Sequence, residues 1–227
     1  MPTNAIQDKE ALISISPEKY ELVKVPVMPA GSSVITDSTF LSINNNVLTG
    51  KCSVDYSGYF GNDVCNRLLY NKGDDERVYA RSRMAKGSNK FIMKDYHITM
   101  PDPMKKEANI SATFEIPDYE KTIADEIYIN LNLEKLISST PIDTAKRKIA
   151  IENDFNYTIN QVHTLAIPDG YTTEYVPKNT SVSNDVFDFS IVYKQGAGNI
   201  SATQKLVMKK LYIEPGDFAT LNRAIYN

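Results

Sequence analysis

The longest regular pattern of hydrophobic positions lies between Val186 and Ile213. Every second position from Phe187 to Tyr193 is aromatic or aliphatic, which is the period of a β-strand with one buried face. Residues 196–199, Gly-Ala-Gly-Asn, then supply the positive φ angles of a tight turn. In the returning half the apolar positions change parity at Lys209-Lys210, which we interpret as a β-bulge. The pattern predicts a long β-hairpin, which needs further strands to form a core.

Other alternating segments predict the remaining strands. Asn44-Asn45-Asn46 joins one pair of segments, and Asn tolerates the left-handed backbone of a hairpin turn. Pro168-Asp169-Gly170 joins a second pair in the same way. Residues 11–15 and 20–27 are interrupted by prolines, so we expect them to be extended and peripheral. The predicted strands in the rest of the chain are residues 34–43, 47–56, 91–99, 109–116, 126–131, 155–167 and 171–176.

Helical signals occur in two places. Gly73 separates residues 63–70 from residues 74–86, where three acidic residues begin a second helical segment. Residues 215–226 have the spacing of a terminal helix. The predicted fold is therefore mainly β, with one or more antiparallel β-sandwiches, a small helical pair and a C-terminal helix. A Pro-rich break at residues 100–103 predicts two domains, residues 1–103 with the helical insertion near 63–86, and residues 104–227.

Composition narrows the classes of function. The 227 residues are 42% hydrophobic and 23% charged, as in globular proteins, and no apolar run approaches the roughly 20 residues of a membrane helix. We therefore expect no transmembrane segment. The formal net charge of -3 gives no general attraction for nucleic acid, so we predict no nucleic-acid partner. Met1 is not followed by the basic and apolar stretches of a signal peptide.

Cys52 and Cys65 are the only cysteines, and they leave two interpretations open. They are either two buried free thiols or a disulfide, and the disulfide requires an oxidising compartment.

No local motif predicts catalysis. His97 and His163 both lie in predicted strands, and no zinc-type spacing, phosphate-binding loop or Gly-x-Ser-x-Gly motif occurs. Only the fold could bring a nucleophile and base together, for example Cys52 and His97. We therefore predict no catalytic residue, no metal site and no cofactor in this chain.

Tyr56, Tyr59 and Phe60 form an aromatic cluster at the end of a predicted hairpin. These rings could contact a ligand, because sugar-binding β-sandwiches use exposed rings for stacking. The alternative is that they pack the helical pair onto the sheet.

Several stretches resemble the C-terminal region of bacterial transglutaminase-like proteins. The opening residues 2–13 are similar to the Ile-Gln-Gly-Lys-x-Ala-Leu-Ile segment that follows the Cys-His-Asp core of that family, with Asp8 in place of the usual Gly. The other similar motifs are Arg147-Lys148, residues 167–171, Tyr175-Val176-Pro177 and residues 213–218.

This resemblance implies that the catalytic core lies upstream and that its residues map onto none of the cysteines or histidines here. The chain would then be a non-catalytic accessory or scaffold region of unknown-function domains, partnered in cis by the core, in a periplasmic or cell-envelope protein. The alternative function is a carbohydrate-binding β-sandwich module, with Tyr56, Tyr59 and Phe60 as ligand contacts. The partner would be a protein or a glycan.

Overall fold

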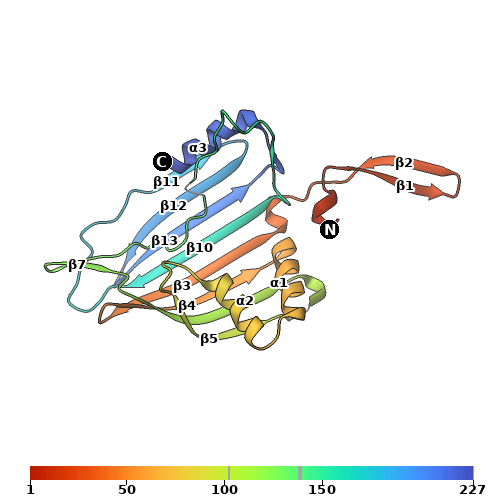
Figure 1. Ribbon diagram of the computed structural model, residues 1–227. Helices are drawn as coiled ribbons and strands as arrows, with labels where there is room; N and C mark the ends of the chain where they lie inside the picture. The colour runs from red at the N-terminus through yellow and green to blue at the C-terminus, as the bar shows by residue number, and fades with distance from the viewer. Residues whose placement is uncertain (102, 138–139, 227) are drawn as a thin grey trace.

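One large sheet organises the chain, as the computed structural model of residues 1–101, 103–137 and 140–226 shows (Figure 1). Its eight strands lie in the order β11-β12-β13-β10-β3-β4-β6-β5. They are β3 (Val34–Asn44), β4 (Val47–Tyr56), β5 (Ile92–Thr99), β6 (Ala108–Pro117), β10 (Tyr157–Ala166), β11 (Thr180–Ser183), β12 (Phe187–Gly196) and β13 (Asn199–Met208). The smaller pairs are β1 (Glu10–Ser16) with β2 (Lys19–Lys24), β7 (Lys121–Ile123) with β8 (Glu126–Tyr128), and β9 (Ile151–Glu152) with β14 (Tyr212–Ile213).

Two of the three hairpins with a turn signal are confirmed. β3 and β4 are joined by Asn45 and Asn46, whose φ angles are 50° and 64°. β12 and β13 are paired from Phe187–Met208 to Gly196–Asn199, and Gly198 has a φ of 74°. The turn residues therefore have the left-handed backbone that the sequence predicts.

The predicted mainly β class is confirmed, but the described residues do not show an antiparallel sandwich. Strands from both ends of the chain join one sheet, in which β10 runs parallel to β3 and antiparallel to β13. Alternation specifies which side chains share a face, and it does not specify how many sheets form or which strands become neighbours. The sheet includes strands from both sides of residue 103, and the division into two domains stays a prediction.

Two local predictions are wrong. Residues 171–176 form no strand, and β10 pairs instead with β3 and β13. Lys209-Lys210 is not a bulge within the hairpin, because β13 ends at Met208 and the chain continues to β14, which pairs with β9. The change in apolar parity therefore marks the passage to another pair of strands. The predicted strand at residues 126–131 is confined to β8.

The predicted helices are confirmed, although the first begins earlier than expected. The α-helices are α1 (Gly58–Tyr70), α2 (Asp74–Met84) and α3 (Phe218–Tyr226), and the short 3₁₀ helices are η1 (Asn4–Ile6), η2 (Ala30–Ser32), η3 (Pro103–Lys105) and η4 (Pro215–Asp217). Helices α1 and α2 lie over the β4-β6-β5 end of the sheet, and α3 lies near β11 and β12 (Figure 1).

The sheet buries one set of alternating side chains. The main hydrophobic cluster joins strand residues such as Leu48, Ile110 and Phe114 to Leu68 of α1 and Met84 of α2. A second cluster surrounds Phe187, Leu206 and Phe218 near α3. Side chains of the opposite parity include partly exposed Ser38, Ser53 and Ser111. The arrangement is therefore one sheet with a packed face and a polar face.

The β1-β2 hairpin extends away from this body (Figure 1). The prediction of an extended, peripheral opening segment is confirmed, while the pairing of its two halves was not predicted.

Candidate functional site

The packed face of the sheet carries a row of buried polar side chains. Strand register places Gln161 beside both Gln204 and Asp37, and His163 beside Thr39. Each of these five residues is at most 3% exposed. The row therefore crosses three adjacent strands, β13, β10 and β3, inside the core.

Lys86 enters this row from just beyond the end of α2. Its ammonium Nζ donates a short hydrogen bond to Asp37 Oδ2 and lies 3.2 Å from Thr39 Oγ1. The Thr39 hydroxyl donates to Asp37 Oδ1 at 2.7 Å. The side chains of Lys86 and Asp37 are 2% and 4% exposed. Such a pair is stable only because each charge has its counter-ion and further hydrogen bonds.

His163 completes the ionic cluster. Its Nδ1 lies 2.9 Å from the Leu131 carbonyl oxygen, and its Nε2 is 3.9 Å from Asp37 Oδ2, which is longer than a hydrogen bond. Desolvation acts to raise the pKa of Asp37, but nearby His163 and Lys86 outweigh it and lower this pKa to about 2. Asp37 is therefore ionised at neutral pH and paired directly with Lys86.

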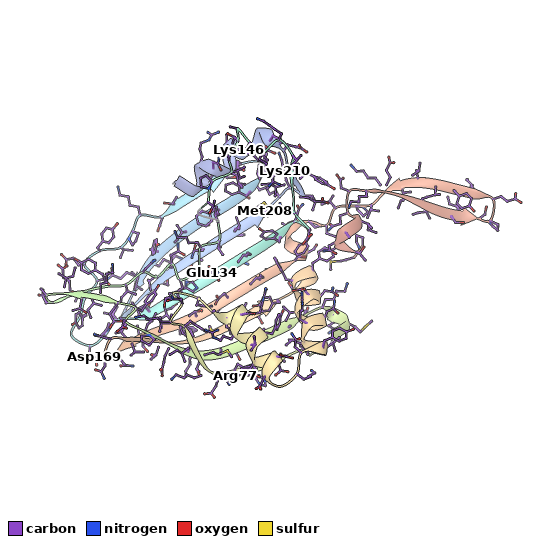
Figure 2. The ribbon with its side chains drawn as sticks, in the orientation of Figure 1. Arg77, Glu134, Lys146, Asp169, Met208 and Lys210 are labelled. Carbon is purple, nitrogen blue, oxygen red and sulfur yellow. The ribbon has the colours of Figure 1, made fainter. Side chains whose placement is uncertain are left out.

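Amide groups extend the row toward the covering segment. Gln161 Nε2 donates to Glu134 Oε2 at 2.9 Å, and Gln204 Nε2 donates to Asn132 Oδ1 at 3.1 Å. Glu134 lies near the middle of the sheet (Figure 2). These bonds tie residues 131–134 to β10 and β13, so the row fixes a connecting segment on the sheet.

This ionic cluster has little access to substrate. Asp37, Lys86 and His163 are all buried, and the charges of Asp37 and Lys86 are paired with each other. The arrangement is that of a structural ion pair. Sequence reasoning placed His163 in a strand, which is confirmed, but missed Asp37 and Lys86. One signal was available for Asp37, because it shares the parity of buried Leu41 in its strand.

The two cysteines are free and buried, so the predicted pair of buried thiols is confirmed and the disulfide is not formed. Cys52 Sγ lies 3.6 Å from the Ala112 carbonyl oxygen, and Cys65 Sγ lies 3.5 Å from that of Glu107. Burial raises the pKa of Cys52 to about 11, so its thiol stays protonated at neutral pH and is a poor nucleophile.

The aromatic cluster packs inside the molecule. Tyr56 and Tyr59 are 3% and 7% exposed, and Phe60 is partly buried. The Arg83 guanidinium lies 5.1 Å from the Tyr56 ring centroid. The ring centroids of Tyr59 and Phe60 lie 4.8 Å and 5.0 Å from that of Phe155. These contacts join α1 to the segment before β10, whereas a ligand role for the three rings stays a prediction.

Cys52 is buried in the packed face of the sheet, whereas His97 is exposed and pairs with Ser111 on the polar face. His97 lines a shallow hollow of about 450 Å³ on β3, β4, β6 and β5. The exposed Phe40 ring and Lys51 line the same hollow, together with the hydroxyl groups of Ser38, Ser53, Ser111 and Thr113.

The N-terminal hairpin carries the largest group of exposed apolar side chains along one segment. Leu12 and Leu22 are opposite each other and are both 66% exposed. Tyr20 lies on the same face, while Ile13 lies on the other face with half of its surface exposed. One face of this two-stranded ribbon therefore exposes Leu12, Leu22 and Tyr20, and the other exposes Ile13 beside the partly buried Ala11 and Val23.

The base of the hairpin is fixed to the body by Gln7, which is 2% exposed. Its Oε1 accepts from the Met28 backbone N–H at 2.8 Å, and its Nε2 donates to the Asp154 carbonyl at 3.3 Å. The next residue, Asp8, has a φ of 61°, and its carboxylate forms a 2.7 Å ion pair with Lys24. A left-handed backbone here explains why glycine suits this position in the resembling segment.

In the part of the chain that the structure describes, no three His, Cys, Asp or Glu side chains gather as a metal site. Among the same residues, no helix is long and apolar enough to cross a membrane.

Comparison with known proteins gives a family match in the C-terminal part of the chain. No curated protein matches the chain, and no link to transglutaminase-like proteins is shown. Residues 125–227, which include β8 to β14 and α3, match the family model DUF3858, a domain of unknown function with a solved structure.

Proposed function

We propose that this chain is a non-catalytic accessory region that packs against a neighbouring folded core and holds it or presents substrate to it. The observation that carries the proposal is the clustering of exposed apolar side chains on the β1-β2 hairpin. Monomeric proteins rarely expose contiguous apolar surface unless it serves in an interaction.

The rest of the molecule supports a structural role. Asp37 and Lys86 form a buried ion pair within the chain, and both thiols are buried. The chain therefore combines a packed sheet body with an apolar hairpin. A scaffold needs both a stable fold and a surface that binds its partner. We propose that the partner is a transglutaminase-like core encoded upstream, in a periplasmic or cell-envelope protein, because the opening residues resemble the segment that follows such a core.

Calorimetric titration of the chain with the separately produced upstream core tests this proposal. Binding should occur with a negative heat-capacity change, because apolar surface is buried. A Leu12→Ser, Leu22→Ser double variant should weaken binding, while Ile149→Ser, which also removes an exposed apolar side chain but lies outside the hairpin, should not. Binding that is indifferent to the double variant, or an upstream sequence without such a core, would contradict the proposal.

A carbohydrate-binding module is the second candidate function. Tyr56 and Tyr59 are only 3% and 7% exposed, and a ligand role for them and for Phe60 stays a prediction. The exposed Phe40 ring, 64% accessible in a hollow lined by hydroxyl groups, is a better placed surface for a sugar. A glycan array decides between the sites: a ligand lost in Phe40→Ala and retained in Tyr59→Phe favours the hollow, and no ligand on the array removes this candidate.

A further inference from the structure

The two outer edges of the N-terminal hairpin differ in their chemistry. β2 carries Lys19, Glu21 and Lys24 and is soon followed by Pro26. β1 carries one charge, Glu10, and its next six residues, Ala-Leu-Ile-Ser-Ile-Ser, contain neither charge nor proline. Charged residues and prolines are the usual means by which an edge strand avoids pairing with another chain. The β2 edge is protected in this way, and the β1 edge is not.

The unprotected edge also lacks a strand partner among the described residues. β1 pairs with β2 alone, in a sheet of two strands. Half of the backbone N–H and C=O groups of such a strand point away from its partner. An isolated two-stranded sheet is only marginally stable in water, so an added strand would stabilise it. The unpaired backbone groups of the β1 edge can therefore form hydrogen bonds with another strand.

From these features we infer that the β1 edge pairs with the β1 edge of a second copy of this chain. Antiparallel pairing about a twofold axis at Leu12 places Leu12 opposite Leu12 of the second copy. It places Ala11 opposite Ile13 and Glu10 opposite Ser14, so no like charges meet. This register uses only the part of β1 that precedes the irregularity between Ser14 and Ser16.

The side chains of the paired edge are self-complementary. Leu12 and Leu22 are opposite each other within one hairpin, so the twofold pairing creates a continuous row of four leucines across four strands. Cross-strand apolar pairs of this kind stabilise sheets. Full antiparallel overlap of two β2 edges would instead place Lys19 opposite Lys24 at both ends. The chemistry therefore selects β1, and the resulting twofold interface is closed.

This inference does not rest on the proposed function, because it uses the edge of the hairpin, whereas docking of a neighbouring core uses its faces. The four-stranded sheet leaves one face with the leucine row and one face with Ala11, Ile13 and Val23 available to such a core. The two proposals can fail separately.

Sedimentation velocity of the full chain, from micromolar to submillimolar concentration, tests the pairing. Leu12 and Leu22 are matched controls, because they are the same residue with the same 66% exposure on the same face. Leu12→Lys places two lysines opposite each other at the twofold axis and should weaken the dimer by about tenfold or more. Leu22→Lys, at the outer end of the row, should weaken it far less.

The expected result is a concentration-dependent dimer that Leu12→Lys dissociates and Leu22→Lys retains. Hydrogen exchange gives a second measurement on the unsubstituted chain, in which the amides of residues 10–14 should gain protection as the concentration rises. A monomer at every concentration would overturn the inference. So would equal weakening by the two variants, since that would indicate packing of faces, and so would open-ended assembly instead of a dimer.

Discussion

Proteins usually bury apolar side chains and expose charged ones. The sheet body departs from this rule by burying charges, and the N-terminal hairpin departs from it by exposing apolar side chains. The body buries a full ion pair, Asp37 with Lys86, whereas the hairpin exposes Leu12 and Leu22 to solvent. The charges of Asp37 and Lys86 are paired within the chain, whereas Leu12 and Leu22 lie opposite each other on the hairpin and are both 66% exposed. The body is therefore stabilised by contacts within the chain, while binding of a partner by the hairpin stays a proposal.

The largest expected effect comes from breaking the ion pair in the body. Lys86→Met leaves the Asp37 carboxylate buried without its counter-ion, which should cost about 3 to 5 kcal/mol of unfolding free energy. Urea denaturation measures this cost. The Lys86→Met, Asp37→Asn double variant should recover much of the loss, because no unpaired charge remains. If the unfolding free energy of Lys86→Met lies within about 1 kcal/mol of that of the unsubstituted protein, the ion pair is not needed for stability.

Two leucines compare the regions directly. Leu48→Ala removes a fully buried side chain from β4 and should cost about 2 to 5 kcal/mol. Leu22→Ala removes an exposed one from β2 and should change the stability of the body by less than about 0.5 kcal/mol. Thermal or urea unfolding at low chain concentration measures both. Comparable losses would mean that the hairpin is already packed in the isolated chain.

Acid should weaken the body through Asp37. Its folded pKa of about 2 lies below its ordinary value, so the stabilisation is present at neutral pH and is lost as pH falls from about 4 to about 2. The loss should be about 2 kcal/mol. Comparison of denaturation curves at several pH values with those of Asp37→Asn isolates this contribution. An unchanged acid dependence in that variant would contradict the assignment.

A smaller loss of unfolding free energy is expected at Gln7, which connects the hairpin to the sheet body. Gln7→Ala removes two hydrogen bonds from a buried position and leaves the Met28 N–H without its acceptor, which should cost about 1 to 2 kcal/mol. Its main consequence should be faster hydrogen exchange at Met28. Glu18→Ala, in the turn at the tip of the hairpin, is the control and should leave that exchange unchanged. Equal exchange in both variants would mean that Gln7 does not fix the hairpin.

The smallest effect is expected at Asp8. Asp8→Gly relieves a left-handed backbone at φ 61° and removes the exposed ion pair with Lys24. These effects oppose each other, so the change in unfolding free energy should stay within about 1 kcal/mol. Asp8→Ala keeps the backbone cost and loses the ion pair, so it should be less stable than Asp8→Gly. The reverse order would contradict this explanation.

Local features of the fold could be predicted from sequence, and distant pairings could not. The turns at Asn45-Asn46 and at Gly198 identify their hairpins because the required backbone is chemically specific. The parallel pairing of β3 with β10 joins residues more than a hundred positions apart, and no periodicity encodes that choice of neighbour. For this reason the sequence predicted an antiparallel sandwich, whereas the described residues form one large mixed sheet.

The candidate sites show the same limit. The alternation of β10 indicates that Gln161 and His163 share a face with buried Leu165, so their burial was open to prediction. The pairing of Asp37 with Lys86 depends on the path of the chain after α2, which sequence patterns do not give. The apolar hairpin was partly foreseen, because residues 11–27 were expected to lie at the periphery.

Hydrogen exchange of the hairpin tests the central claim most directly. The isolated chain at low concentration and its mixture with the separately produced upstream core should be compared amide by amide. The account predicts rapid exchange in residues 10–24 of the isolated chain, slow exchange in β3 and β10, and strong protection of residues 10–24 when the core is added. Slow exchange of the hairpin in the isolated chain, or protection by the core that is confined to the sheet body, would contradict it.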